Sequence, residues 1–214
     1  AKLAEMEIAA QPLLSWYDNN KRTLPWREDP TPYHVWVSEI MLQQTRVEAV
    51  RGYYDRFMKA LPDIAHLAQA KDEELLKLWE GLGYYNRVRN MKKAARMIME
   101  EYGGVMPEEY EDLLRLPGIG SYTAGAVSSI ACGRRAPAVD GNVLRVLSRL
   151  KGDGRDIARQ SVRDDVTEEL WRDMDTERPG DFNQALMELG ATVCIPVGAP
   201  HCGECPWEAL CAAH

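Results

Sequence analysis

Apolar residues recur every three or four positions along most of the chain, the spacing that places them on one face of an α-helix. The segments with this pattern are 5–17, 33–59, 72–79, 87–101, 108–116, 122–131, 142–150, 161–173 and 181–193. Convincing alternation with a period of two, which would indicate half-buried strands, is missing. The pattern therefore predicts an all-α fold with no sheet of consequence.

Glycine and proline interrupt the apolar pattern and mark where the predicted helices end. The breaks are LP at 61–62, GLG at 81–83, YGGVMP at 102–107, LPGIG at 116–120 and GDG at 152–154. The composition changes sharply after Cys194, where the chain becomes rich in Pro, Gly and Cys. Such a tail cannot pack as a helix, so we expect another source of order there.

Length and composition are those of an ordinary globular protein: 214 residues, 45% apolar and 28% charged, enough for one large domain or two small ones. No apolar run is long enough to cross a bilayer, and Lys2, Glu5 and Glu7 interrupt the first apolar residues. We therefore expect no signal peptide, no anchor and no membrane partner.

The net charge of −7 is weak evidence against a nucleic-acid partner, because a local basic stripe is enough to hold phosphates. The simpler explanation of a basic cluster on a helix is a solvated charged face. The clusters are Arg46, Arg51 and Arg56; Arg87, Arg89, Lys92, Lys93 and Arg96; and Arg134, Arg135, Arg145, Arg149 and Lys151.

Four cysteines lie close together in the tail, Cys194, Cys202, Cys205 and Cys211, with gaps of seven, two and five residues. Without an export signal, this spacing favours one metal site over disulfides, and metal binding would order the loop. Zinc and a [4Fe–4S] cluster both accept four thiolates, and the spacing does not choose between them. The fifth cysteine, Cys132, follows an apolar helical pattern and is expected to be buried.

The segment LPGIGSYTAG at 116–125 joins two helical patterns. Gly118 and Gly120 permit positive φ and let the backbone come close to another molecule. The helix that opens at this turn presents free N–H groups and the positive end of its dipole, which suits a phosphate. A plain corner between two helices explains the same residues.

Two carboxyl groups occupy opposite predicted environments. Glu39, in VSEIMLQQT at 37–45, shares its helix face with Val35, Trp36 and Leu42. It is either an edge residue that reaches water or a group kept partly protonated for chemistry. Asp140 precedes a helical pattern and is expected to be its N-cap, which keeps the carboxylate ionised. Such a divided pair is typical of acid and anion roles in one site.

Five segments in order, VSEIMLQQT, GLGYYNRVRN, LPGIGSYTAG, AVDGNVLRV and the four terminal cysteines, resemble the helix-hairpin-helix DNA glycosylase superfamily, and within it the MutY-type adenine DNA glycosylases. The resemblance runs from LPW at 24–26 to Cys211. It implies a two-lobed all-α fold, with a six-helix lobe over 26–130 that contains the hairpin. Residues 1–25 and 131–214 would form a second helical lobe that ends in a [4Fe–4S] cluster bound by the four cysteines.

The resemblance also implies catalytic roles. Glu39 aligns with the general acid that protonates adenine N7, which makes the base a better leaving group. Asp140 aligns with the carboxylate that stabilises the oxocarbenium-like sugar. Tyr122 stands where related bifunctional lyases have a lysine, so we expect base removal without efficient strand cleavage. Asn142 would help to hold the site together.

Further positions match residues that bind DNA in the family. Trp26, Arg27 and Gln184 would line the pocket for the flipped base. Gln44 and Tyr84 would insert into the duplex where the base leaves the stack.

In the hairpin, Gly118 and Gly120 would grip the phosphate backbone, where the family often holds a monovalent cation. The implied partner is double-stranded DNA with an adenine mispair. We expect a monomer in the bacterial cytoplasm, associated with the nucleoid.

The sequence departs from the family at two places. The first cysteine gap is seven residues where six is usual, and its loop lacks basic residues, so we expect no DNA contact from that loop. Full-length relatives continue into a domain that recognises 8-oxoguanine, whereas this sequence stops at His214. We therefore expect removal of adenine opposite 8-oxoguanine or guanine, with a weakened preference for the oxidised base.

Two other functions remain open. A thymine mismatch glycosylase of the same superfamily would share the hairpin, the aspartate and the cluster, but Glu39 and Gly141 favour adenine. A non-catalytic iron–sulfur module that only binds DNA would also explain the hairpin and the cysteines.

Overall fold

The computed structural model describes residues 4–174 and 177–214, with side chains from Ala10 onward, and contains helices and no strand within those ranges. Two compact units form, the central unit of Thr23–Cys132 and the terminal unit of Ala1–Arg22 and Gly133–His214. The sequence prediction placed the boundaries at 25/26 and 130/131. Residues 1–3 of its second lobe, and residues 175 and 176, lie outside the described residues.

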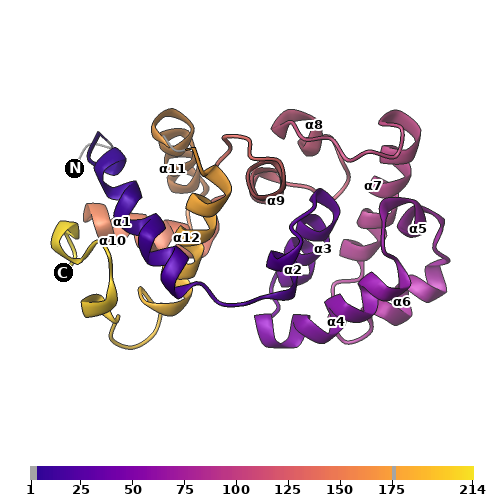
Figure 1. Ribbon diagram of the computed structural model, residues 1–214, viewed down its shortest axis with the longest axis horizontal. Coiled ribbons are helices and arrows are strands. Elements are labelled where there is room, and N and C mark those ends of the chain that lie inside the picture. Colours follow the sequence, from indigo (N-terminus) through magenta and orange to yellow (C-terminus); the bar gives the residue numbers. More distant parts are fainter. Residues whose placement is uncertain (1–3, 175–176) are drawn as a thin grey trace. The chain divides into compact units, whose positions relative to one another are not determined.

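The central unit is built from helices (Figure 1), and their buried side chains form one apolar core. Its elements are α2 (Pro25–Glu28), α3 (Pro32–Leu42), α4 (Val47–Ala60), α5 (Ile64–Gln69), α6 (Asp72–Trp79), α7 (Asn86–Glu101), α8 (Tyr110–Leu114), α9 (Ser121–Ala126) and the π-helical turn η1 (Val127–Ala131).

Helix α3 is the buried axis of the central unit. Thr31 caps its N-terminus by accepting a hydrogen bond from the His34 N–H at 3.2 Å, and Pro32 supplies a preset φ at the first position. Every residue from Val35 to Met41 is buried, because α2, α4, α9 and η1 surround the helix. A helix that is covered on all sides leaves no water-exposed face for its one carboxylate.

The continuous helical pattern predicted over 33–59 is wrong at its middle. Residues 43–46 form a turn between α3 and α4, because the polar run QQTR cannot continue a buried helix and Gln44 adopts a φ of 59°. The prediction also missed α5, whose N-cap Asp63 accepts from the His66 N–H at 2.9 Å. Cys132, expected to be buried, is partly exposed at the end of η1.

The terminal unit combines segments from both ends of the sequence. Its elements are α1 (Ala4–Asn20), α10 (Gly141–Lys151), α11 (Gln160–Asp173), α12 (Pro179–Thr192) and the 3₁₀ turns η2 (Cys202–Glu204) and η3 (Glu208–Leu210). Helix α12 packs on both α1 and α10, and the side chains between them form a second apolar core. The irregular tail is attached to this core by Trp207, which is 1% exposed.

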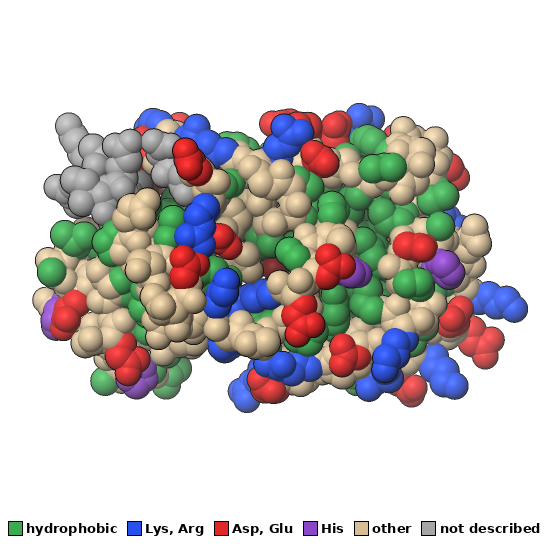
Figure 2. Space-filling model, viewed as in Figure 1, with side chains coloured by type: hydrophobic (Ala, Val, Ile, Leu, Met, Phe, Trp, Pro, Cys, Tyr) green, Lys and Arg blue, Asp and Glu red, His purple; other side chains and the backbone are tan. Residues whose placement is uncertain are grey.

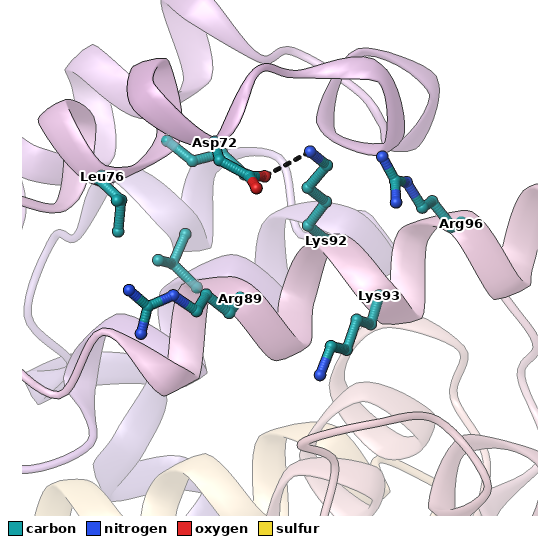
Figure 3. Close-up of a pocket in the computed structure, with 8 residues that line it drawn as sticks. Asp72, Leu76, Arg89, Lys92, Lys93 and Arg96 are labelled. Atoms are coloured by element: carbon teal, nitrogen blue, oxygen red, sulfur yellow. Dashed lines mark hydrogen bonds and ion pairs between the residues drawn. The ribbon is translucent and has the colours of Figure 1, made fainter.

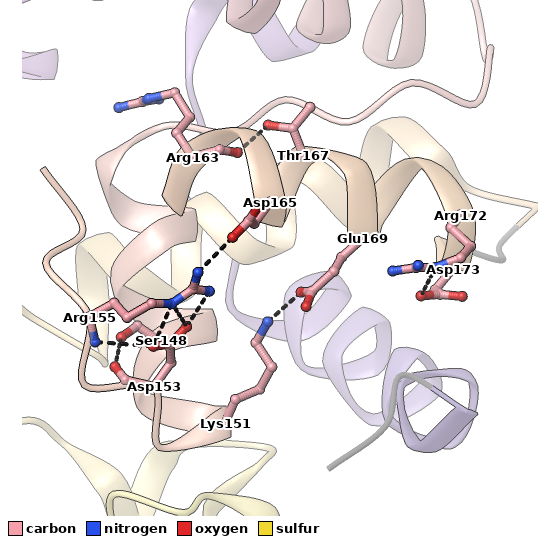
Figure 4. A network of polar contacts seen from close by, with 10 residues as sticks. All are labelled: Ser148, Lys151, Asp153, Arg155, Arg163, Asp165, Thr167, Glu169, Arg172 and Asp173. Carbon is pink, nitrogen blue, oxygen red and sulfur yellow. Dashed lines mark hydrogen bonds and ion pairs between the residues drawn. The ribbon is translucent and has the colours of Figure 1, made fainter. Parts of the chain in front are cut away.

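Two polar features fix the geometry of the terminal unit. Glu188, 1% exposed on α12, accepts hydrogen bonds from the backbone N–H and the guanidinium of Arg22, with Nε at 2.7 Å. In the turn after α10, the Arg155 guanidinium pairs with Asp153 and Asp165 (Figure 4). Its hydrogen bonds lower the pKa of Asp153 to about 2. These pairs close the turn between α10 and α11.

The described residues contain no helix long and apolar enough to cross a membrane. Acidic and basic side chains are interspersed over the face shown in Figure 2. The net negative charge therefore does not gather into a single acidic field on that face.

Gly190 sets how closely α12 approaches the N-terminus of α10. A Cβ at this position would lie 2.7 Å from Asn142 Cβ and 3.1 Å from Asn142 Cα. We expect Gly190→Ala to lower the free energy of unfolding by about 1–3 kcal/mol, because overpacking forces backbone shifts. Urea unfolding followed by circular dichroism measures the change.

Gly154→Ala is the matched control. Its added Cβ would meet nothing within 4 Å, so we expect a change within about 0.5 kcal/mol. Equal stability of the two variants would show that the packing of α12 on α10 tolerates a side chain.

Candidate functional site

Glu39 is the chargeable group buried on α3, with 9% of its surface exposed. Tyr122, on α9, donates a hydrogen bond from its hydroxyl to Glu39 Oε2 at 2.7 Å. Both residues belong to the central unit, so a shared core holds the helices that place them together. The alternative that Glu39 is an edge residue reaching bulk water is therefore wrong.

Gln44 and Tyr84 have a backbone feature that periodicity could not reveal. They are the non-glycine residues with positive φ in the described part of the chain, at 59° and 49°. Both are exposed, and Tyr84 has 67% of its surface accessible. Left-handed backbone at non-glycine residues costs about 1–3 kcal/mol and persists only where the surroundings enforce it.

The two predicted pocket residues of α2 differ in exposure. Trp26 is 6% exposed and packs edge-on against Tyr54, with ring centroids 5.5 Å apart. Arg27, the next residue, is partly exposed. Gln184, the third predicted pocket residue, is partly exposed on α12 of the terminal unit.

The hairpin connects α8 to α9 through residues 116–120. Gly118 has φ 78°, and a Cβ there would lie 2.9 Å from Asn90 Cβ on α7. Gly120 is the N-cap of α9 in extended conformation, and a Cβ there would meet nothing within 4 Å. Gly118 is thus required by the turn and its packing, while Gly120 leaves the start of α9 open to approach.

Asp140 caps α10, as predicted, by accepting a hydrogen bond from the Val143 N–H at 2.9 Å. Its other oxygen accepts from Asn142 Nδ2 at 3.0 Å. Asn142 Oδ1 accepts in turn from Arg145, whose Nε also donates to the carbonyl of Cys194 at 2.9 Å. Arg145 therefore ties the Asp140 cap to the start of the cysteine tail.

Sequence reasoning missed Asn183, which is fully buried on α12. Its amide accepts from the Ala138 N–H at 3.2 Å and donates to the Ala136 carbonyl at 2.8 Å, which fixes the segment that leads to Asp140. It also missed the role of Arg145, which the sequence placed in a basic cluster. A single sequence gives no signal that separates these side chains from solvated ones.

The four tail cysteines are all partly exposed and lie in the terminal unit. Arg149 donates to the sulfur of Cys194 at 3.3 Å, and the Trp207 N–H donates to the sulfur of Cys205 at 3.4 Å. Burial raises the pKa of Cys205, and the nearby thiols add to the shift. Among the described residues, no three His, Cys, Asp or Glu side chains are grouped as a metal site.

A basic pocket of about 170 Å³ lies between α6 and α7 (Figure 3). Arg89, Lys92, Lys93 and Arg96 line it, and Lys92 pairs with Asp72 at 2.6 Å. The pocket shares no residue with the site predicted from the sequence. It shows instead that the basic cluster on α7 is partly built into the fold, since Lys92 is 9% exposed.

Comparison with known proteins gives a family match. Residues 37–172 match the model of the HhH-GPD superfamily base excision DNA repair proteins. Adenine DNA glycosylases from Rattus norvegicus and Homo sapiens are 48% and 49% identical to 99% of this chain. The chain covers 43% and 40% of those relatives, so it spans about two fifths of their length.

Solved structures share the fold. A thermostable thymine-DNA glycosylase has a TM-score of 0.86 and 28% identity, over 97% of this chain and 95% of that one. An endonuclease III in a non-covalent complex with DNA has a TM-score of 0.80 and 23% identity, over 100% of this chain and 96% of that one. The all-α prediction is confirmed.

Proposed function

Because the chain belongs to the HhH-GPD superfamily of base excision DNA repair proteins, we propose that it is a monofunctional glycosylase that removes adenine from mispairs in double-stranded DNA. The partner base would be guanine or 8-oxoguanine. The relatives called adenine DNA glycosylases support adenine, since they are 48–49% identical over 99% of this chain.

The observation that carries the proposal is the buried contact between Tyr122 and Glu39, at 2.7 Å. A carboxyl in an apolar helix favours its neutral form, because burial penalises the charge. A neutral carboxyl can donate a proton near neutral pH, as a general acid must. We therefore assign proton donation to the adenine ring to Glu39 and the orientation of that carboxyl to Tyr122.

The reaction would be hydrolysis of the bond between the base and the sugar. Protonation lets adenine leave as a neutral molecule, and the sugar becomes positively charged as the bond breaks. We assign the stabilisation of that charge to the Asp140 carboxylate, which its hydrogen bonds with the Val143 N–H and Asn142 hold in place. Because Tyr122 has no amine, it cannot form a Schiff base, so the DNA strand would stay intact.

Contact with DNA would come from several parts of the chain. The exposed side chains of Gln44 and Tyr84 suit insertion into a base stack, because one is an amide and the other an aromatic ring. The hairpin at Gly118 and Gly120 suits a phosphate at the start of α9, with a monovalent cation as an aid. We assign Trp26, Arg27 and Gln184 to the lining of the base pocket.

The tail cysteines fit a thiolate-bound [4Fe–4S] cluster. The four sulfurs come from one short segment, and N–H donors already point at Cys194 and Cys205, which stabilises thiolate charge. We propose that Cys194, Cys202, Cys205 and Cys211 hold the cluster, which would supply folding free energy and no step of base removal. The protein would act as a monomer in the bacterial cytoplasm, at the nucleoid.

Thymine is the second candidate substrate, favoured by the fold similarity to a thymine-DNA glycosylase at 28% identity. Two observations argue for adenine. The adenine DNA glycosylases are more similar to this chain, at 48–49% identity. In addition, thymine is a pyrimidine and has no N7 that the buried Glu39 could protonate. Excision from guanine:adenine and guanine:thymine duplexes separates the two. Release of thymine alone would replace the present proposal.

We expect Glu39→Gln to reduce single-turnover excision of adenine by about 10²–10⁴-fold, because glutamine keeps the shape and cannot give up the proton. Affinity for the duplex should stay within a few-fold. Gel-based excision and fluorescence anisotropy measure the two properties.

Glu101→Gln is the matched control, since Glu101 is exposed at the end of α7. We expect this variant to excise adenine at the wild-type rate. A Glu39→Gln enzyme with wild-type excision would refute the assigned acid. A wild-type protein that binds the duplex without excision would support the binding module instead.

We expect the purified protein to contain about four iron atoms per chain and no stoichiometric zinc. Elemental analysis measures both metals, and a brown colour accompanies the iron. Removal of the iron by a chelator should lower the thermal midpoint, because the tail loses a source of order. One zinc per chain would overturn the cluster assignment while leaving the glycosylase proposal standing.

A further inference from the structure

Arg87, near the start of α7, makes an unusual set of backbone contacts in the central unit. Its Nη1 donates to the carbonyls of Ile40 at 2.7 Å and Gln43 at 2.6 Å. Its Nη2 donates to the carbonyls of Leu82 at 3.2 Å and Gly83 at 3.3 Å. One guanidinium thus joins the end of α3 to the turn after α6.

Two of the four bonded carbonyls belong to the peptide units that directly precede the two residues with positive φ. The Gln43 carbonyl is in the peptide linked to Gln44, with φ 59°, and the Gly83 carbonyl is in the peptide linked to Tyr84, with φ 49°. The plane of the preceding peptide unit is one of the two planes that define a residue's φ, so holding that plane restricts φ. Arg87 therefore restrains both left-handed residues at once.

The ring contacts reinforce the same arrangement. The Arg87 guanidinium lies 5.3 Å from the Trp79 ring centroid and 5.7 Å from that of Tyr84. The indole N–H of Trp79 donates to the same Gly83 carbonyl at 3.0 Å. A cation over an aromatic face is attracted by the ring, so Arg87 holds the Tyr84 side chain as well as its backbone.

The fork of the guanidinium is essential to this geometry. Burial lowers the pKa of Arg87, but a guanidinium stays charged in proteins, so its bonds remain charge-assisted. A lysine ammonium in the same place is a compact point charge and lacks the two NH₂ groups that the planar guanidinium holds in a fixed fork. It could not bridge two turns of backbone in the same way.

We infer that Arg87 is a positioning residue that holds Gln44 and Tyr84 in the backbone conformation needed to enter the duplex. This inference rests on the proposed function and adds one residue to it. Arg87 itself acts through the two exposed side chains, whose strained backbone it maintains.

The test measures unstacking of DNA without chemistry. A duplex contains 2-aminopurine next to the mispaired adenine, and the inactive Glu39→Gln protein serves as the background. Its binding should raise the fluorescence, since insertion unstacks the probe. Adding Arg87→Lys should abolish most of that rise while saturation of binding is still reached. Arg89 is an exposed arginine of the same helix, and adding Arg89→Lys instead should leave the increase in 2-aminopurine fluorescence unchanged.

Excision gives the second readout. In otherwise wild-type protein, Arg87→Lys should slow single-turnover excision by about 10- to 100-fold, the scale expected when reacting groups are misplaced. In a background of Gln44→Ala and Tyr84→Ala, the same substitution should have almost no further effect, because Arg87 acts through those residues. A merely destabilising substitution would add its own loss in that background.

Circular dichroism must show that the Arg87→Lys variant is folded at the assay temperature. If that variant is unfolded, the same measurements are made with Arg87→Gln, which keeps an amide donor. Unchanged fluorescence and excision in the folded variant overturn the inference. If wild-type protein excises nothing, the proposed function fails, while the fluorescence of the bound duplex still decides the role of Arg87.

Discussion

The burial of one carboxyl group on α3 is the constraint on which the central unit depends. Surrounding helices cover every residue from Val35 to Met41, and all of these side chains are apolar except those of Ser38 and Glu39. A fold selected only for stability would place an apolar residue at the position of Glu39, because a buried polar group costs free energy unless it is paired. The Tyr122 hydroxyl offsets part of that cost. The proposed role of Glu39 as a general acid gives a reason for this buried, paired carboxyl that packing alone does not give.

In the terminal unit, the carboxylate of Asp140 is held by hydrogen bonds at a helix start, whereas Glu39 is buried within a helix. Asp140 stands at a helix start and takes hydrogen bonds from a backbone N–H and from Asn142. Asn142, Arg145 and the Cys194 carbonyl continue that chain of contacts to the tail. The close approach of α12 through Gly190 keeps Asn142 in place from the other side. The order of the tail and the position of Asp140 are therefore parts of one packing arrangement.

Periodicity predicted the all-α class and most helices, because an amphipathic helix face depends only on residues three or four positions apart in the sequence. It failed between Leu42 and Val47, where the break depends on Gln44 in a conformation that costs free energy and that distant contacts enforce. It also missed α5, whose signal was the Asp63 cap before a short apolar run.

The site residues show a similar limit. The position of Asp140 predicted its capping role. The local neighbours of Glu39 left open whether its carboxyl reaches water, and only the packing of the surrounding helices shows that it is buried. The roles of Arg87, Arg145 and Asn183 could not be read, because each depends on carbonyl groups distant in the sequence. In the sequence, nothing distinguishes Arg87 and Arg145 from the other basic residues of their clusters. Only the fold distinguishes an arginine that holds backbone from one that faces water.

The interrupted terminal unit has a consequence for biosynthesis. Helix α1 leaves the ribosome before the central unit, yet its packing partners α11 and α12 are translated after the whole central unit. Until then its apolar side chains, Leu13 and Leu14 among them, have no native core to enter. The central unit can complete its own core first, as domains commonly do during synthesis. A nascent chain stalled before α12 would thus pair a finished domain with an unprotected helix, a natural target for chaperones.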